Sequence, residues 1–257
     1  MMQLRPSFLD WASYRHGLRR WARAARKIRN MDLTDLRAER ARARKLRYFL
    51  NEVISVADNR LSLPMIGSNA FPKPHGTDWS WRPELWREPL PVPGMSSVQS
   101  KSMLGTEVTL FHDCAHSELT LRQVRNSREV DLAPYGLRLD VFNFDGSFLS
   151  LVLDMPKDAA NGLQKRHLIR MDTIVEMEKP LEIFARLNIK HGPNTEQIVR
   201  ELPLAETDCV VEFDLAYTSL NEKRIERAWI DLIFENPQMS QVTLRDLTFS
   251  RSPRADL

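Results

Sequence analysis

Hydrophobic and polar residues alternate along much of the chain after residue 107, which is the pattern of strands with one buried face. Two segments show it most clearly, residues 226–235 and their expected neighbour, residues 209–217. The apolar positions of the first segment are Ala228, Ile230, Leu232 and Phe234, and those of the second are Val211, Phe213, Leu215 and Tyr217. Strands with one apolar side require a second apolar layer, so the pattern predicts two packed sheets.

Ten strands are expected in this part of the chain, with turn signals roughly every ten residues. They cover residues 107–111, 118–124, 137–144, 147–153, 167–176, 181–190, 195–202, 209–217, 226–234 and 241–250. Asp145-Gly146 is expected to close a tight hairpin, and residues 191–194 (His-Gly-Pro-Asn) form a second turn. The predicted fold is therefore mainly β: an antiparallel, jelly-roll-like β-sandwich preceded by an N-terminal α-helical segment.

The first sixty residues show a helical period instead. Residues 7–29 predict an amphipathic helix that ends near Asn30, and Asp32 is a candidate N-cap for a second helix over residues 33–57. The apolar stripe of the first helix consists of Trp11, Tyr14, Leu18, Trp21, Ala25 and Ile28. Its arginines fall largely elsewhere on the helical wheel: Arg15, Arg19, Arg23, Arg26 and Arg29.

Residues 61–100 have a different composition, with seven of the 15 prolines and three of the six tryptophans. Prolines exclude helix interiors, and three tryptophans are too much apolar surface for a free linker. We expect an ordered strap against the sandwich, with an aromatic ligand platform as the alternative. The expected domains are a basic helical segment (1–60), a Pro/Trp-rich strap or linker (61–100) and the β-sandwich (101–257).

Composition and charge limit the class of protein and its expected location in the cell. The chain has 257 residues, 42% hydrophobic, and no apolar run long enough to span a bilayer. Residues 1–60 carry 15 basic and 6 acidic residues (+9), and the remainder carries 22 and 28 (−6), which gives the net +3. No secretory signal is seen and only two cysteines are present, so we expect a cytoplasmic protein with reduced thiols and no cofactor.

Three interpretations of the basic helices remain open. They pack on each other, on the sandwich or on a second subunit; they dock to a partner protein or to anionic lipid at the inner membrane face; or they bind nucleic acid. Aromatic residues opposite an arginine-rich face suit a lipid boundary, and the residues concerned are Trp11, Arg15, Arg19, Trp21, Arg23 and Arg26. Nucleic acid is the weakest of the three, because no recognised reading motif accompanies the charge. The oligomeric state is not predicted.

The densest cluster of reactive side chains is His112-Asp113-Cys114-Ala115-His116. It contains zinc ligand types, but no second ligand cluster follows it. The alternative is a polar loop whose side chains hydrogen-bond the backbone.

The sides of the strands opposite the apolar stripes carry mixed polar and aromatic residues. They are Glu212, Asp214, Trp229, Asp231, Arg186, Asn188, Lys190, Arg138, Asp140 and Phe142. An aromatic ring can stack on a sugar while carboxylate, amide and guanidinium groups bond its hydroxyls. The same inventory also fits a surface of cross-strand ion pairs.

Several stretches resemble an uncharacterised family of bacterial proteins, a domain of unknown function. They are residues 76–83 (Gly-Thr-Asp-Trp-Ser-Trp-Arg-Pro), 111–114 (Phe-His-Asp-Cys), 144–151 (Phe-Asp-Gly-Ser-Phe-Leu-Ser-Leu), and a tail from 228–234 (Ala-Trp-Ile-Asp-Leu-Ile-Phe) through 244–247 (Leu-Arg-Asp-Leu) to Arg251. The resemblance implies no catalytic residue. The C-terminal strands resemble, more loosely, the jelly rolls of carbohydrate-binding modules.

Three functions are therefore weighed. The first is non-catalytic binding of carbohydrate or glycoconjugate, with Trp229, Asp231, Asp214, Arg186 and Asn188 as the residues to test. The second is an interaction module or scaffold that docks through residues 1–60. The third is a metal- or thiol-dependent enzyme centred on residues 112–116.

Overall fold

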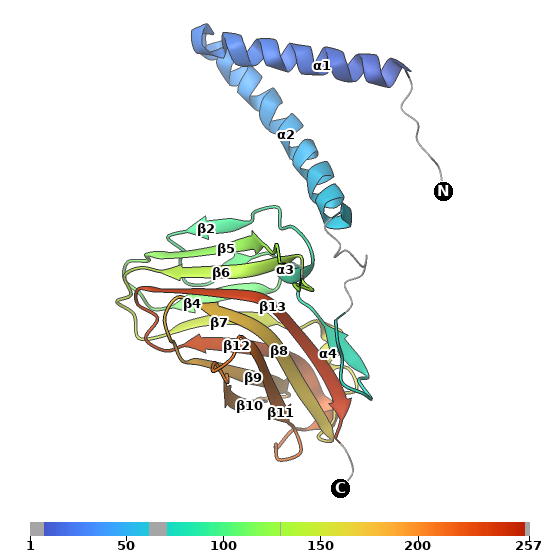
Figure 1. Ribbon diagram of the computed structural model, residues 1–257, viewed down its shortest axis with the longest axis vertical. Helices are drawn as coiled ribbons and strands as arrows, with labels where there is room; N and C mark the ends of the chain where they lie inside the picture. Colours follow the sequence, from blue (N-terminus) through green and yellow to red (C-terminus); the bar gives the residue numbers. More distant parts are fainter. Residues whose placement is uncertain (1–7, 62–70, 129, 255–257) are drawn as a thin grey trace. The chain divides into compact units, whose positions relative to one another are not determined.

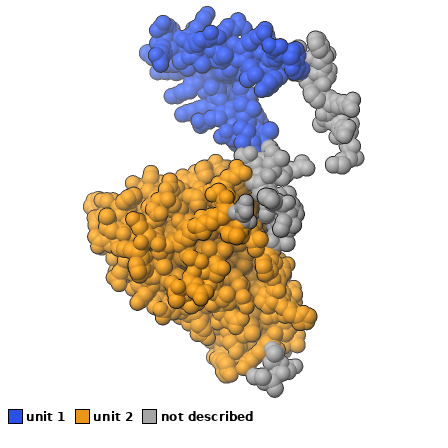
Figure 2. Space-filling model, viewed as in Figure 1, with its two compact units in different colours: residues 1–54 blue, residues 55–257 orange. Residues whose placement is uncertain are grey.

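The computed structural model describes residues 8–61, 71–128 and 130–254. They divide into two compact units, residues 1–54 and 55–257 (Figure 2). The first contains α1 (Phe8–Lys27), the 3-10 turn η1 (Ile28–Asn30) and most of α2 (Leu33–Leu61). Asp32 caps α2 as predicted, because its Oδ2 accepts a hydrogen bond from the Thr34 N–H at 3.1 Å. Among the described residues, no helix is both long and apolar enough to cross a membrane.

The second unit is a sandwich of two antiparallel sheets, which confirms the predicted fold class (Figure 1). All ten predicted strands are present, with ends shifted by at most three residues. They are β4 (Val108–His112), β5 (Leu119–Arg125), β6 (Tyr135–Val141), β7 (Leu149–Asp154), β8 (His167–Met177), β9 (Ile183–His191), β10 (Asn194–Glu201), β11 (Asp208–Asp214), β12 (Ile225–Phe234) and β13 (Ser240–Pro253). The unpredicted elements are β1 (Trp79–Trp81), α3 (Glu84–Arg87), β2 (Gly94–Ser96), β3 (Ser102–Leu104), α4 (Lys157–Ala160) and the 3-10 turn η2 (Glu222–Arg224).

The seven-stranded sheet has the order β11-β8-β13-β6-β5-β2, with β1 paired to β13. The six-stranded sheet has the order β10-β9-β12-β7-β4-β3. The chain changes sheet at most connections, as in a jelly roll, so strands close in sequence seldom pair. In particular, β11 pairs β8 whereas β12 pairs β7 and β9, so the two most strongly patterned segments are not hydrogen-bonded neighbours as expected. They lie in different sheets instead.

The core lies between the sheets and is formed by the alternating apolar positions. Ala228, Ile230, Leu232 and Phe234 are buried from one side, and Val211, Phe213 and Leu215 from the other. Tyr217, expected in the same stripe, is exposed because β11 ends at Asp214. The tryptophans of the 61–100 segment, Trp79, Trp81 and Trp86, also belong to this core. The described part of that segment is therefore packed into the sandwich.

The Asp145-Gly146 signal was misread as a hairpin, because β6 and β7 lie in different sheets. Gly146 is needed for space rather than for a turn conformation. A Cβ atom at this position would lie 2.5 Å from Asp113 Oδ1 and 3.0 Å from Cys114 N, both in the loop that joins β4 to β5. The predicted turn at residues 191–194 is confirmed: β9 and β10 are joined through Gly192, whose φ of 61° is positive.

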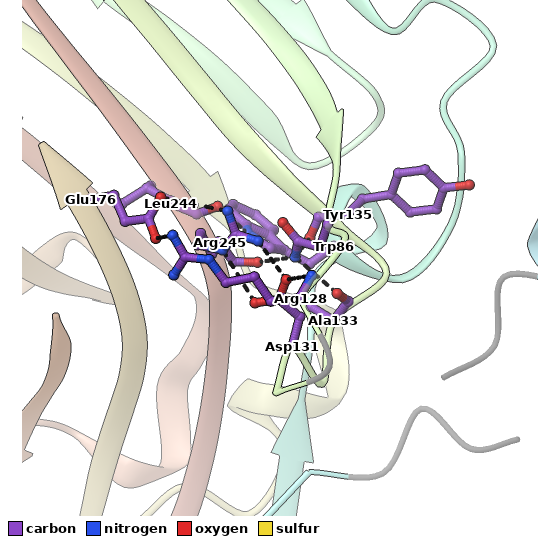
Figure 3. Close-up of polar contacts among 9 residues, drawn as sticks. Trp86, Arg128, Asp131, Ala133, Tyr135, Glu176, Leu244 and Arg245 are labelled. Carbon is purple, nitrogen blue, oxygen red and sulfur yellow. Dashed lines mark hydrogen bonds and ion pairs between the residues drawn. The ribbon is translucent and has the colours of Figure 1, made fainter. Parts of the chain in front are cut away.

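A partly buried polar network holds the loop between β5 and β6 against β13 and β8 (Figure 3). Arg245 is paired with Asp131, with 3.2 Å between its Nε and Asp131 Oδ1, and its Nη1 lies 3.5 Å from Glu176 Oε2. Beside it, Trp86 Nε1 donates to the Leu244 carbonyl at 3.0 Å. Burial alone would raise the pKa of Asp131, but the hydrogen bonds and charge of Arg245 outweigh it and lower that pKa.

Candidate functional site

The outer face of the six-stranded sheet brings together four of the five residues singled out for ligand binding. Arg186 and Asn188 come from β9, and Trp229 and Asp231 from β12. The register pairs Asp231 with Arg186 and Trp229 with Asn188, so the four side chains are cross-strand neighbours on the side opposite Ile230 and Leu187.

Asp231 is the centre of a hydrogen-bond network on this face. Its Oδ2 accepts from Arg186 Nε at 2.8 Å, from Arg186 Nη2 at 2.6 Å and from Asn188 Nδ2 at 3.1 Å. Gln197 of β10 extends the network, because its Nε2 donates to Asn188 Oδ1 at 2.9 Å. Asp231 and Asn188 are buried, whereas the Arg186 side chain is partly exposed. The cross-strand ion pair weighed as the alternative is present, and it fixes these polar groups in place.

Beside this network the face contains a hollow with a volume of about 380 Å³. The hollow is lined by Phe111, Phe148, Ser150, Val152, Arg186, Asp231 and Ile233. Its two aromatic rings, Phe111 of β4 and Phe148 just before β7, were not among the predicted site residues. Phe148 is 44% exposed. The hollow therefore combines aromatic surface with an anchored guanidinium–carboxylate pair.

Phe148 is presented by a loop that Asp113 holds. Asp113 Oδ1 accepts from the Ser147 N–H at 2.7 Å and from the Phe148 N–H at 3.2 Å, and its Oδ2 accepts from Ser147 Oγ at 2.6 Å. In return, Asp145 Oδ1 accepts from the Ala115 N–H at 3.1 Å. The Ser147 hydroxyl bond, with the backbone N–H bonds, lowers the pKa of Asp113, so its charge is retained at neutral pH.

The remaining residues of the 112–116 cluster also serve this loop or face solvent. His112 is buried; its Nε2 lies 2.8 Å from the Val98 carbonyl, and its Nδ1 accepts from the Cys114 N–H at 3.2 Å. Burial raises the pKa of the Cys114 thiol, so a smaller fraction of it is the nucleophilic thiolate at neutral pH. His116 is exposed. Within residues 8–61, 71–128 and 130–254, no three His, Cys, Asp or Glu side chains gather in a metal-binding group.

The fifth candidate, Asp214, lies on the other sheet. It ends β11, on the outer face of the seven-stranded sheet, where its Oδ2 lies 3.4 Å from Arg254 Nη1. Glu212, Arg138 and Asp140 share that sheet and form ion pairs there, and Phe142 directly follows β6. The sequence analysis grouped these residues on one surface, but they lie on the outer faces of two sheets. The reason is that β11 and β6 belong to the seven-stranded sheet, whereas β9 and β12 belong to the six-stranded sheet.

Trp229 lies on the hollowed face but outside the hollow. Its ring is half-buried, and the Arg227 guanidinium carbon lies 4.6 Å from the ring centroid. This is a cation–π contact. Phe111 and Phe148, and not Trp229, are the aromatic residues that line the hollow.

Of the basic residues predicted on the first helix, Arg15, Arg19, Arg23 and Arg26 lie on α1, and Arg29 lies in η1. The Arg15 guanidinium carbon is 4.7 Å from the Trp11 ring centroid, and that of Arg20 is 5.5 Å from the Trp21 ring centroid. Arg23 and Arg26 each donate from Nε to the carbonyl four residues earlier at 3.2 Å, so their side chains lie along the helix.

Several solved structures have a similar arrangement of strands. The enzymatically active domain of bacteriophage CBA120 tailspike protein 4 is 10% identical, with a TM-score of 0.41; the match covers 60% of this chain and 21% of that one. The family 11 carbohydrate-binding module from Clostridium thermocellum, in complex with a β-1,3-1,4-mixed-linked tetrasaccharide, is 11% identical, with a TM-score of 0.39 and coverage of 63% and 97%. A putative sugar binding protein from Bacteroides thetaiotaomicron is 12% identical, with a TM-score of 0.36 and coverage of 62% and 94%. Likenesses at this level do not assign a ligand.

Comparison with curated proteins found no match. A model of one protein family, described as a family of unknown function (DUF6478), matches residues 1–257. The match spans the helical unit and the sandwich together, and it agrees with the resemblance carried by residues 76–83 and 144–151. The chain therefore belongs to the DUF6478 family, whose function is unknown.

Proposed function

We propose that the chain is a non-catalytic carbohydrate-binding protein and that the ligand occupies the hollow on the outer face of the six-stranded sheet. The observation that supports this most directly is the hollow itself, in which the rings of Phe111 and Phe148 adjoin the Arg186–Asp231 pair. Its volume of about 380 Å³ falls within the range of small-molecule sites, about 300–1,000 Å³.

The chemistry of a sugar explains why these residue types suit it. One surface of a pyranose is made of C–H groups, which pack on aromatic rings, while its rim carries hydroxyls that require polar partners. Phe148 offers an exposed ring. The Arg186 guanidinium is partly exposed, and the Asp231 carboxylate to which it is paired is buried. Because these polar groups are already fixed, little side-chain entropy is lost when they bind a ligand.

The carboxylates of the hollow support binding without hydrolysis. Glycoside hydrolysis generally uses two carboxyl groups across the scissile bond. Among the residues that line the hollow, Asp231 is the one carboxylate, and three hydrogen bonds already occupy its Oδ2. An anchored carboxylate of this kind orients a ligand but is poorly placed to transfer a proton.

The described part of the 61–100 segment, residues 71–100, contributes no residue to the lining of the hollow. Trp81 stacks on Phe249 of β13 with ring centroids 5.3 Å apart, and Trp86 donates to Leu244 of the same strand. Both contacts are with the seven-stranded sheet. The tryptophans therefore pack into the core instead of covering the hollow.

The test is a glycan array followed by titration calorimetry with the strongest ligand. Phe148→Ala removes the exposed ring and is expected to weaken binding about tenfold or more, roughly 1.4 kcal/mol. The matched control is Phe142→Ala, which removes another exposed phenylalanine of the same unit outside the hollow. Binding that is equal in wild type and Phe148→Ala, or no binding to any glycan, would overturn the proposal.

A further inference from the structure

Helix α1 carries an apolar stripe that is largely exposed; Trp21 is half-buried, and the stripe residues nearer the N-terminus are exposed. At about 100° per residue, the five apolar positions of the stripe on α1, from Trp11 to Ala25, fall within an arc of about 80°, and Ile28 follows in η1. Trp11 is 51% exposed, Tyr14 64% and Leu18 53%. Of the side chains described in residues 11–54, none is buried. Aromatic and aliphatic surface on this scale is unusual without a function.

The other side of α1 is strongly basic. Residues 8–30 contain seven Arg and Lys residues and one acidic residue, Asp10, which gives a surplus of six positive charges. Arg15, Arg19 and Arg23 lie on the arc of about 40–120° from Trp11, next to the apolar stripe. Long arginine side chains in this position can reach an anionic surface while the stripe is buried below them.

We propose that α1 lies in the interface of an anionic phospholipid bilayer, with Trp11, Tyr14 and Leu18 among the acyl chains and its arginines at the phosphate head groups. Charge selects this occupant. A lipid head-group layer supplies negative charge opposite this positive surplus, whereas a second copy of residues 8–30 would bring two surpluses of six together. Nucleic acid would satisfy the arginines but would leave the apolar stripe without a partner.

The experiment is co-sedimentation of the full chain with vesicles of phosphatidylcholine alone and with phosphatidylglycerol added. We expect binding only to the anionic vesicles and weakening as salt rises. Each basic residue near such a surface contributes about fivefold, so Arg15→Gln/Arg19→Gln/Arg23→Gln should bind more than about 100-fold more weakly. The corresponding triple Arg→Lys variant keeps the charge and should retain binding.

A second pair of variants tests the apolar half. Trp11→Ser/Leu18→Ser should also lose vesicle binding, whereas Val210→Ser, which removes an exposed apolar residue of the sandwich, should not. Sugar binding should be unchanged in all of them. The proposal fails if anionic vesicles bind no better than neutral ones or if the α1 variants bind normally. It also fails if the wild-type chain is a dimer and Trp11→Ser/Leu18→Ser makes it a monomer. It fails too if the chain binds a DNA or RNA duplex more tightly than it binds the anionic vesicles.

Discussion

At the residue scale, the hollow depends on what projects from the outer face of β7 and its neighbours. Val152 lines the bottom of the hollow, and its strand register pairs it with Asp231 of β12 on one side and with Thr109 of β4 on the other. Ser150, one position along the same face, pairs with Ile233 and Phe111. Small or medium side chains at these two positions leave space between the aromatic rings and the Arg186–Asp231 pair. Larger side chains at these two positions would fill the hollow.

Filling the hollow should therefore abolish ligand binding without harming the fold. Val152→Phe places a ring in the hollow, yet it faces away from the core, so the midpoint of thermal unfolding should hardly change. Calorimetric titration with the array-selected glycan measures the effect. Val210→Phe makes the same change at an exposed position on the other sheet and should bind normally. Unchanged affinity in Val152→Phe would place the ligand elsewhere.

At the element scale, short segments far apart in sequence are joined by buried ion pairs. Arg82, just after β1, donates from Nε to Asp246 Oδ1 at 3.0 Å and from Nη2 to Asp246 Oδ2 at 2.7 Å. Asp246 lies at the register shift in β13, and its burial raises its pKa even though Arg82 acts to lower it. The bidentate pair thus ties the 71–100 segment to the central strand of the sheet.

Removing one partner of this pair should be costly. Arg82→Met leaves the Asp246 carboxylate buried without its cation and should lower the free energy of unfolding by about 3–5 kcal/mol in urea denaturation. Arg122→Met provides the comparison, because Arg122 lies 3.6 Å from Asp140 but is half exposed. It should cost less than about 1 kcal/mol. Equal losses in the two variants would contradict the role assigned to Arg82.

The loop between β5 and β6 should make the sandwich sensitive to acid. Since the folded pKa of Asp131 is lower than its unfolded value near 3.9, its contribution is complete above about pH 5. It is lost as the pH falls through the folded pKa, because Asp131 then takes up a proton. Urea unfolding of wild type and Asp131→Asn should show a clear difference at pH 7 that narrows towards pH 2. A difference that is constant or widens in acid would exclude the Arg245–Asp131 pair as its source.

The strands could be predicted from sequence because period-two alternation is a local signal. Their partners could not, since the choice between sheets depends on contacts across the core. That is why residues 209–217 and 226–235 were paired wrongly and Asp214 was grouped with Asp231. β1, β2 and β3 are three residues long, too short to show a period. Phe148 was missed because its role depends on Asp113, 35 residues earlier in the chain.

At the scale of the whole molecule, the two units differ in how they are stabilised. The buried hydrophobic residues from Trp79 to Phe249 all lie in residues 55–257, and none is found among the described side chains of residues 11–54. The sandwich therefore has a complete core of its own. The helical unit presents two amphipathic helices whose apolar positions are largely exposed.

A chain reduced to residues 55–257 should consequently fold and bind as the intact protein does. Its thermal midpoint is expected within about 4 °C of the full-length value, since about 1 kcal/mol shifts a domain of this size by about 2–4 °C. Calorimetry and the same glycan titration check this, with vesicle co-sedimentation as the property that should disappear. Aggregation or loss of glycan binding in the shortened chain would show that the sandwich depends on residues 1–54.

The most direct measurement of the central claim is a map of where a sugar binds. An oligosaccharide selected on the glycan array is titrated into isotopically labelled protein, and backbone amide shifts are followed by NMR. The account predicts saturable shifts at Ser150, Arg186 and Asp231 on the hollowed face, with none at Asp140 or Glu212 on the other sheet. Shifts confined to the seven-stranded sheet, or no saturable shift with any glycan, would contradict it.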